Sequence, residues 1–319
     1  MSDPLVSICC ITYNHEAYIG DAIAGFIGQR LRFACEILIG EDCSTDGTRA
    51  VIKSWQDRYP GRIQLVTGDH NIGGRANAMR LRQLARGRYI ATCEGDDYWT
   101  DPDKLQRQVD ALEDNPGCSA CFHAVAVVRP GGRPTGRILR PPGMNPEKIY
   151  KADEIITLMG GVFHMSSALM RRDYLLDLPD FYRTCKVGDL PLTLVLADRG
   201  NFLFLDQVWS HYRVGVPGSA IRRFFGGAAP DPSEALRRSL LEAYEAFDQY
   251  SHQRYAAAVA AAMDQVRFQI LLGKPDLKVL RREPFRTWFR ALSRTERLKT
   301  RLRAWCPRLY QIVKRCCHE

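Results

Sequence analysis

The sequence predicts an α/β protein with a mostly parallel central sheet, helices on both faces, and a helical C-terminal region. Short apolar runs of strand length alternate four times with segments of helical periodicity in the first third of the chain. This alternation is typical of parallel sheets with crossover helices. The 319 residues are 45% hydrophobic and 25% charged, which excludes a disordered chain and leaves room for two domains. We expect these domains at 1–220 and 221–319.

The secondary structure of the first domain is predicted from short, regular segments. Strands are predicted at 5–12, 36–40, 63–66 and 88–93, and helices at 16–28, from Asp46 onward, and at 76–86. Right-handed crossovers place the loops that follow such strands at one edge of the sheet, where open α/β folds bind ligands. Functional side chains are therefore expected after the strands.

The pattern beyond residue 128 is less regular. Strands are predicted at 161–170, 201–206 and 207–212, helices at 189–198, 233–248 and 254–272, and a loop at the Pro- and Gly-rich segment 129–146. The sequence has neither a secretory signal nor an apolar run of membrane-spanning length, so we expect a cytoplasmic protein. Its 11 cysteines are interpreted as small apolar residues with free thiols, as is usual in that compartment. A zinc site is not favoured, because Cys118 and Cys121 form only half of a zinc-site spacing.

Acidic residues cluster at predicted strand ends and at one helix start. The clusters are EDCSTDGT at 41–48, EGDD at 94–97, and Asp189. Neighbouring carboxylates repel one another unless a cation lies among them, and their hard oxygen atoms suit Mg²⁺ or Mn²⁺. Helix capping is an equally good explanation for Ser44 and Asp46.

The order and spacing of several segments resemble those of family 2 glycosyltransferases of GT-A fold. The resemblance lies in VSICCITYNHEAYIGDAI, EILIGEDCSTDGT, NIGGRANA and GRYIATCEGDDYW, followed by SSALMRRD and VGDLPLTLVLADRGNFLFLDQVWSHYR. The family shows a similar series of V-S-I-x-x-x-T-Y-N, D-D-x-S-T-D-G-T, N-x-G and D-x-D motifs. The resemblance covers about residues 4–220 and implies a Rossmann-like GT-A domain there.

The resemblance also implies roles for individual residues. Asp42 matches the aspartate that contacts the base, commonly uracil, and Asp96 matches the acid that holds a metal ion, Mn²⁺ or Mg²⁺, at the diphosphate. Asp189 matches the general base for the acceptor. The residues expected to contact the nucleotide-sugar are Thr12, Tyr13, Asn14, Glu16, Asp42, Ser44, Arg75, Glu94, Asp97 and Arg213.

Three positions depart from the family pattern. Glu94 stands where the D-x-D motif usually begins with Asp, and Glu41 replaces the first Asp of D-D-x-S. Family members often read Y-R-x-H, and this chain has Gly215 at the histidine position. His211 lies upstream and is the remaining histidine candidate for a metal ligand, while Arg213 is a candidate clamp for the diphosphate.

The resemblance predicts a hexosyltransferase-type enzyme that uses a nucleotide-sugar, with UDP favoured. The acceptor would be a hydroxyl of a saccharide or lipid-linked saccharide, as in polysaccharide or surface-glycan synthesis. One base and one metal-bound leaving group fit a single displacement with inversion. A metal-dependent nucleotidyltransferase is the alternative enzyme, but the loop after the first strand lacks the expected Gly and Lys. A non-catalytic sugar- or nucleotide-binding scaffold is the other alternative, and the presence of Asp96 and Asp189 argues against it.

The formal net charge of +9 is concentrated near the C-terminus. Segment 278–319 has 13 Lys and Arg against three Asp and Glu, so the rest of the chain is close to neutral. Apolar residues, including aromatic ones, recur at helical spacing among arginines between residues 284 and 315. This pattern fits a helix on the anionic inner face of a membrane, and it fits equally a helix packed on the catalytic body. Binding to nucleic acid is a weaker alternative, because no known motif accompanies the charge.

Overall fold

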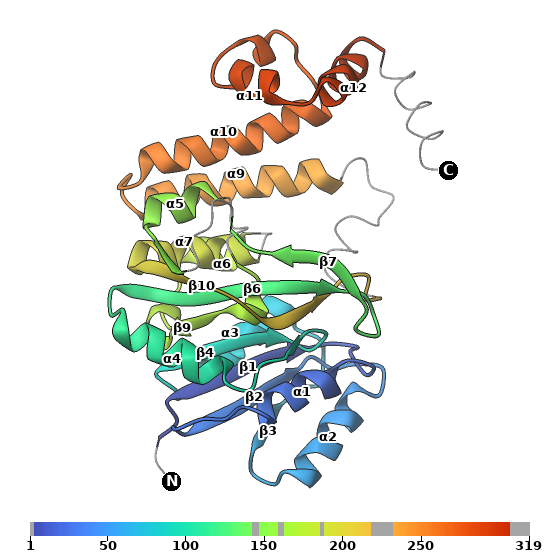
Figure 1. Cartoon of the computed structure of the whole chain (residues 1–319), viewed down its shortest axis with the longest axis vertical. Coiled ribbons are helices and arrows are strands. Elements are labelled where there is room, and N and C mark those ends of the chain that lie inside the picture. Colours follow the sequence, from blue (N-terminus) through green and yellow to red (C-terminus); the bar gives the residue numbers. More distant parts are fainter. Residues whose placement is uncertain (1–2, 142–146, 159–162, 186–187, 218–231, 307–319) are drawn as a thin grey trace. The chain divides into compact units, whose positions relative to one another are not determined.

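A computed structural model describes residues 3–141, 147–158, 163–185, 188–217 and 232–306 of the chain (Figure 1). The chain forms two compact units. The first comprises Met1–Thr184 with Gly188–Arg223, and the second comprises Cys185–Val187 with Phe224–Glu319. The first unit contains the sheet, and the second is helical.

Four parallel strands form one half of the sheet, as the sequence predicts. They are β1 (Val6–Thr12), β2 (Cys35–Glu41), β3 (Ile63–Val66) and β4 (Tyr89–Glu94), in the order β3-β2-β1-β4. In register, Thr12 pairs with Glu41, and Ile11 pairs with Glu94. The carboxyl ends of β1, β2 and β4 therefore meet at one edge of the sheet.

The other half of the sheet is mixed. It contains β5 (Tyr98–Trp99), β6 (Cys118–Val128), β7 (Pro134–Leu139), β8 (Glu147–Tyr150), β9 (Leu169–Arg171) and β10 (Asn201–Arg213). Strand β9 is antiparallel to β4 and β6 and joins the two halves, while β10 runs parallel to β6.

Three sequence predictions in this half are corrected by the structure. The predicted loop 129–146 contains strand β7, although 142–146 lie outside the described residues. Segments 201–206 and 207–212 form one strand, because a β-bulge in β10 interrupts its alternation without ending it. In the predicted strand 161–170, Met165–Ser167 form a 3₁₀ turn (η1), 169–170 belong to β9, and 161–162 lie outside the described residues.

Helices cover both faces of the sheet. One face carries α1 (Ile19–Ile27), α2 (Thr48–Arg58) and α4 (Lys104–Asp114); the other carries α3 (Gly74–Leu84), α5 (Ala152–Thr157) and α7 (Asp189–Arg199). Shorter helices η2 (Arg172–Leu175) and α6 (Asp180–Thr184) contact α7. This arrangement confirms the predicted α/β class.

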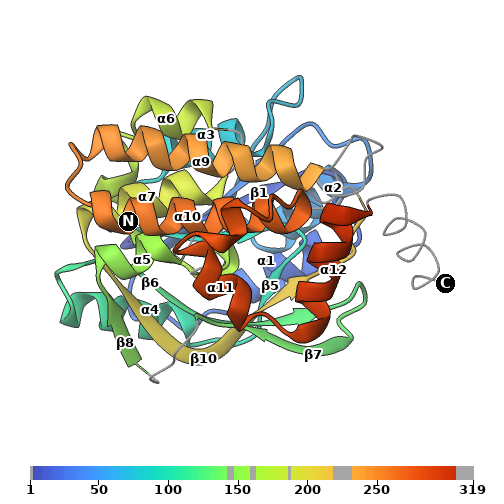
Figure 2. The same ribbon diagram turned by 90° about the horizontal axis from the view of Figure 1, so that it is seen from above.

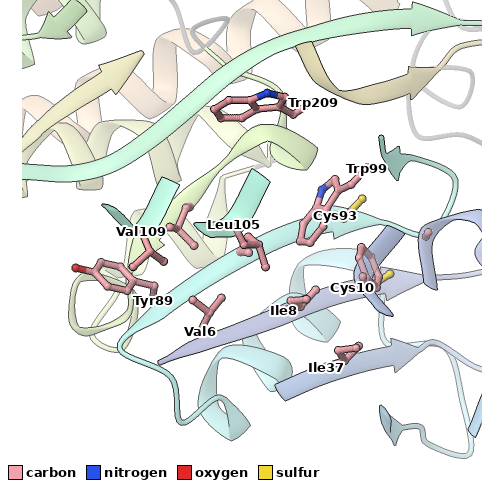
Figure 3. Packing of buried hydrophobic residues seen from close by; sticks show 14 of the residues in the cluster. Val6, Ile8, Cys10, Ile37, Tyr89, Cys93, Trp99, Leu105, Val109 and Trp209 are labelled. Atoms are coloured by element: carbon pink, nitrogen blue, oxygen red, sulfur yellow. The ribbon is translucent and has the colours of Figure 1, made fainter. Parts of the chain in front are cut away.

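The main core lies between the sheet and the first of these helical layers (Figure 3). Val6, Ile8 and Cys10 point to this side of β1 because alternate strand residues share a face. They pack with buried side chains from β2, β4, α1 and α4, including Leu105. The cysteine at position 10 is buried with a free thiol, and burial raises its pKa well above the ordinary value.

The second unit is built from helices. Helices α9 (Pro232–Tyr250) and α10 (Ala256–Gly273) lie side by side (Figure 2), followed by η3 (Val279–Arg281), α11 (Phe285–Ala291) and α12 (Arg294–Trp305). Phe268, Leu280 and Phe289 form a small buried cluster. Among the described residues, no helix combines the length and apolarity that a membrane crossing requires.

Candidate functional site

A cluster of three acidic side chains lies in the first unit, in the turn that begins at the end of β4. Glu94, Asp96 and Asp97 each offer one carboxylate oxygen, and these oxygens all lie within 4.8 Å of one another. The backbone N–H of Asp97 donates to the Glu94 carbonyl at 3.0 Å, which folds the acidic turn back on itself. Gly95, which follows Glu94 in the sequence, packs so tightly on Thr12 that a Cβ at this position would overlap the threonine hydroxyl. The turn is thereby held against the end of β1.

The three carboxylates crowd one another. Burial and the neighbouring charges of Asp96 and Asp189 raise the pKa of Glu94 to about 8. Burial and the adjacent carboxylates raise the pKa of Asp97 well above its ordinary value, against the opposing effect of Arg213. Asp96 Oδ1 and Asp97 Oδ2 are buried and lack a hydrogen-bond partner in the described part of the chain. A divalent cation would relieve this repulsion, and the oxygen donors fit Mg²⁺ or Mn²⁺.

Arg213, at the end of β10, braces this acidic turn. Its backbone N–H donates to Asp97 Oδ1 at 2.9 Å, and its Nη1 donates to the carbonyl of Asp96 at 2.8 Å. Its Nη2 pairs with Asp21 of α1, and the guanidinium lies 4.3 Å from the centroid of the Tyr98 ring. These contacts favour a supporting role over the predicted clamp on the diphosphate.

A cavity of about 670 Å³ lies beside that guanidinium. Its lining includes Arg213, Asp21 and Tyr98, together with residues of α1 and of the loop between β6 and β7. The acidic turn itself does not line it. The cavity is therefore separate from the carboxylate cluster, although Arg213 contacts both.

Two histidines approach the cluster. His15 Nε2 lies 3.8 Å from Asp96 Oδ2, and its Nδ1 is 3.2 Å from the Thr12 hydroxyl. His164 Nδ1 lies 3.5 Å from Asp97 Oδ2, and burial lowers the pKa of this imidazole to about 4. The sequence places His15 in a loop near the nucleotide and His164 on the acceptor side, and for both it favours polar filling over contact with substrate.

His211, the remaining histidine candidate for a metal ligand, contacts Tyr98. Its Nδ1 is 2.7 Å from the Tyr98 hydroxyl, and the two rings meet edge to face. Strands β5 and β10 pair these two residues directly. The described group of convergent metal ligands includes the three carboxylates and not His211.

The loop after β2 is tied to the loop after β3 by Asp42. Its buried carboxylate accepts the backbone N–H groups of Ile72 and Gly73, each at 2.9 Å. The Asn71 side-chain amide donates to the Asp42 carbonyl at 3.0 Å. Gly73 has a φ of 85°, which favours glycine in this turn. Asp42 is thus fixed in position at the sheet edge.

The loops after β1 and β2 form one hydrogen-bonded platform. The Asn14 backbone N–H donates to Ser44 Oγ at 3.0 Å, and the Thr45 N–H donates to Asn14 Oδ1 at 2.8 Å. Glu16 accepts the backbone N–H of the N-cap residue of α2 at 3.0 Å. Half-buried Tyr13 lies in the same loop. The structure therefore brings the predicted residues of these two loops together.

Asp189 begins α7 and is exposed. Desolvation by the surrounding protein still raises the pKa of its carboxyl, against the opposing charges of Arg82 and Arg75. Both arginines stack on the Tyr182 ring, at 5.5 and 5.7 Å from its centroid. Because the charge of Asp189 also raises the pKa of Glu94, the start of α7 and the acidic turn share one electrostatic site.

His15 lies in the loop that the sequence places near the nucleotide, only three residues from Thr12. Three other residues at this site escape the sequence patterns: Asp21, Arg82 and His164. Each reaches the site through the tertiary fold. Asp21 and Arg213, for example, are 192 residues apart. No local spacing links such residues, so a single sequence carries no signal for them.

The family model of glycosyl transferase family 2 matches residues 7–178, more than half of the chain. The uncharacterized protein Rv1520 of Mycobacterium tuberculosis is 45% identical over 127 residues, which cover 40% of this chain and 37% of that protein. Putative teichuronic acid biosynthesis glycosyltransferase TuaG of Bacillus subtilis is 30% identical over 139 residues, 44% of this chain and 54% of TuaG. The chain thus spans about half or less of these relatives' lengths.

A third relative is the UDP-Glc:alpha-D-GlcNAc-diphosphoundecaprenol beta-1,3-glucosyltransferase WfgD of Escherichia coli, 32% identical over 115 residues, 36% of this chain and 44% of WfgD. Among solved structures, S. aureus TarS 1-349 in complex with UDP-GlcNAc aligns with a TM-score of 0.63 and 17% identity, covering 90% of this chain and 79% of TarS. That likeness supports the GT-A fold. The extent of the family match shows that the chain belongs to glycosyl transferase family 2.

Proposed function

We propose that this protein transfers a sugar from a nucleotide-sugar, with UDP as its nucleotide, to a hydroxyl of a saccharide or lipid-linked saccharide. The observation that carries this proposal is the convergence of three carboxylates after β4, in electrostatic contact with Asp189. The names of WfgD and TuaG, and the UDP-GlcNAc bound to TarS, support the donor and acceptor classes. Work on a lipid-linked acceptor would place the protein at the cytoplasmic face of a membrane.

The acidic turn would hold Mg²⁺ or Mn²⁺ through Asp96 and Asp97, each of which has one buried carboxylate oxygen without a hydrogen bond in the described part of the chain, with Glu94 beside them. A bound divalent ion would neutralise negative charge on the departing diphosphate. Arg213 would keep the turn in shape through its contacts with Asp97 and the Asp96 carbonyl. His15 would support the Asp96 carboxylate from the β1 loop.

The platform after β1 and β2 would bind the nucleotide. Two backbone amides orient the Asp42 carboxylate, and each oxygen keeps a lone pair with which to accept an N–H of the base. Thr12, Tyr13 and Asn14 would border the nucleoside at the end of β1. We also assign Arg75, at the start of α3, to the phosphate side of this site, because it lies within electrostatic reach of Asp189.

Asp189 would act as the general base. A sugar hydroxyl is a weak nucleophile, and a carboxylate that takes its proton during attack lowers the barrier. The raised pKa of Asp189 makes it a better proton acceptor than an ordinary aspartate. With one base on the acceptor side and the leaving group opposite, we propose a single displacement with inversion.

The test is a thermal-shift series with UDP, GDP, dTDP and CDP, each with and without Mn²⁺, followed by turnover of UDP-sugars. UDP is expected to stabilise the wild type only with metal, and Asp96→Asn should lose that shift. Asp189→Asn should keep the shift and lose transfer by about 10²-fold or more. Asp57→Asn, an exposed carboxyl on α2, is the matched control and should change neither.

Two outcomes would contradict the proposal. Absence of any nucleotide-induced shift in the presence of metal would remove the donor site. A UDP shift without turnover of any UDP-sugar, with acceptors supplied, would favour the non-catalytic scaffold.

A further inference from the structure

The outer side of α12 exposes apolar side chains. Leu298 and Trp305 each expose 67% of their surface, more than any other large apolar residue that the structure describes. Half-buried Leu302 lies between them. Steps of four and three residues place all three in one stripe along the helix. We call this stripe, with the cations that flank it, the outer face of α12.

Three cations flank the apolar stripe. At about 100° per residue, Arg294 and Arg301 lie along one side of it and Lys299 along the other. All three are exposed. The acidic residue of the helix, Glu296, lies away from the centre of the stripe and pairs with Lys299 at 3.3 Å. The outer face therefore combines a Leu and Trp stripe with an excess of positive charge.

The opposite side of α12 is the one that faces its own unit, and it is polar. Thr300 is buried and donates to the Glu296 carbonyl at 2.8 Å. Arg303 Nη1 donates to the Leu272 carbonyl of α10 at 2.6 Å. A helix that packs on a protein usually turns its apolar stripe inward. Helix α12 turns its stripe outward.

The neighbouring helix α11 behaves in the ordinary way. Phe285 and Trp288 contact the Phe268 ring of α10, and Phe289 is buried in the same cluster. Within segment 284–315, α11 thus fits the interpretation of a helix packed on the protein. The outer face of α12 does not, and 307–315 lie outside the described residues.

We propose that the outer face of α12 docks on an anionic phospholipid surface. Tryptophan and leucine are suited to the boundary between headgroups and acyl chains, and the flanking cations are suited to lipid phosphates. The same charges disfavour a second copy of this chain, because a symmetric contact would bring like charges together. Nucleic acid would use the cations but leave the apolar stripe in water. The proposal rests on α12 alone and is independent of the transferase activity.

Vesicle flotation of the full chain tests the proposal, using phosphatidylcholine vesicles with and without phosphatidylglycerol and no nucleotide. The wild type should float with the anionic vesicles, less so at high salt, and poorly with the neutral ones. Removing a cation from such a contact costs about fivefold in affinity, so Arg294→Glu with Arg301→Glu should weaken binding at least about 25-fold. Leu298→Ser with Trp305→Ser should weaken it about tenfold or more.

Matched controls carry the same changes on exposed residues of the first unit. Leu176→Ser with Ile138→Ser matches the apolar pair, and Lys53→Glu with Arg137→Glu matches the charge pair. Both controls should bind anionic vesicles as the wild type does. Because all the substituted side chains are exposed, circular dichroism and melting temperature should stay unchanged in every variant.

Equal flotation of the wild type and both α12 variants would overturn the proposal, as would equal binding to neutral vesicles. Sedimentation velocity tests whether a second copy of this chain, instead of lipid, covers the outer face of α12. If the wild type does not bind lipid but self-associates, and Leu298→Ser with Trp305→Ser makes it monomeric, the face is a contact between copies. The variant Asp96→Asn should float normally, which separates this result from failure of the proposed transferase function.

Discussion

Replacing Lys104 with methionine is expected to change how the stability of the first unit depends on pH. Lys104 begins α4 and is completely buried. Its Nζ donates to Gln108 Oε1 at 2.7 Å and lies 4.0 Å from the centroid of the Trp99 ring, so both described partners are neutral. Burial lowers the pKa of this ammonium group to about 7 from its ordinary value of 10.5.

The sign follows from proton binding. Between about pH 7 and 10.5 the unfolded chain holds a proton on Lys104 that the folded chain releases. Stability rises with pH wherever the unfolded state binds more protons. The penalty for burying this lysine is therefore fully present below pH 7 and fades as the pH rises to 10.5.

The size of the effect follows from these two pKa values. Between pH 6 and pH 9, the free energy of unfolding of the wild type should rise by about 2.5 kcal/mol relative to Lys104→Met, since each pKa unit corresponds to about 1.4 kcal/mol. For a unit of this size, that is about 5–10 °C in melting temperature. Urea denaturation of both proteins at several pH values measures it.

Only the difference in slope matters here, because the lost hydrogen bond to Gln108 shifts the whole curve by a constant amount. Lys53→Met, on the exposed side of α2, is the control and should give a curve parallel to the wild type. If the curves of Lys104→Met and the wild type are also parallel, Lys104 stays protonated in the fold and the reasoning from burial is wrong.

Three further substitutions test the supports of the site. Asp42→Ala leaves two backbone amides without their charged acceptor and should cost about 2–4 kcal/mol in urea denaturation without nucleotide. Gly40→Ala would press a Cβ into the buried Asn77 side chain and should cost about 1–3 kcal/mol, whereas Gly117→Ala has open space and should be neutral by the same assay. Arg213→Lys keeps the charge, but one amine cannot reach both the acidic turn and α1; the melting temperature and the Mn²⁺-dependent UDP shift should both fall.

The first half of the fold could be predicted because its signals are local. Each of the four parallel strands is a short apolar run, and each lies within a few residues of the predicted range. The second half depends on pairing between distant segments. A bulge near Asp206 lets β10 continue where alternation fails, and β7 exists because it pairs with β6. Neither pairing leaves a periodic signal in the sequence.

The site also contains residues that could be predicted from local sequence signals and residues that could not. Carboxylates at strand ends could be predicted, because parallel register alone brings the ends of β1, β2 and β4 together. The partners of those carboxylates could not. His164 meets Asp97 through the turn η1, and His211 is directed to Tyr98 by antiparallel pairing of β5 with β10. Which histidine approaches the acidic turn is decided by tertiary contacts.

The acidic turn is held together mainly by backbone contacts rather than by neutralising charge. Arg213 contacts the turn, yet its Nη1 donates to the Asp96 carbonyl and its ion pair is made with Asp21. The carboxylates therefore keep their repulsion, which adds to burial in raising the pKa values of Glu94 and Asp97. A site in this state gains stability from whatever neutralises it, and protons and divalent cations then compete for the same oxygens. If the proposed function holds, the carboxylates remain unneutralised in the free protein, and binding of a metal-bound diphosphate relieves their mutual repulsion.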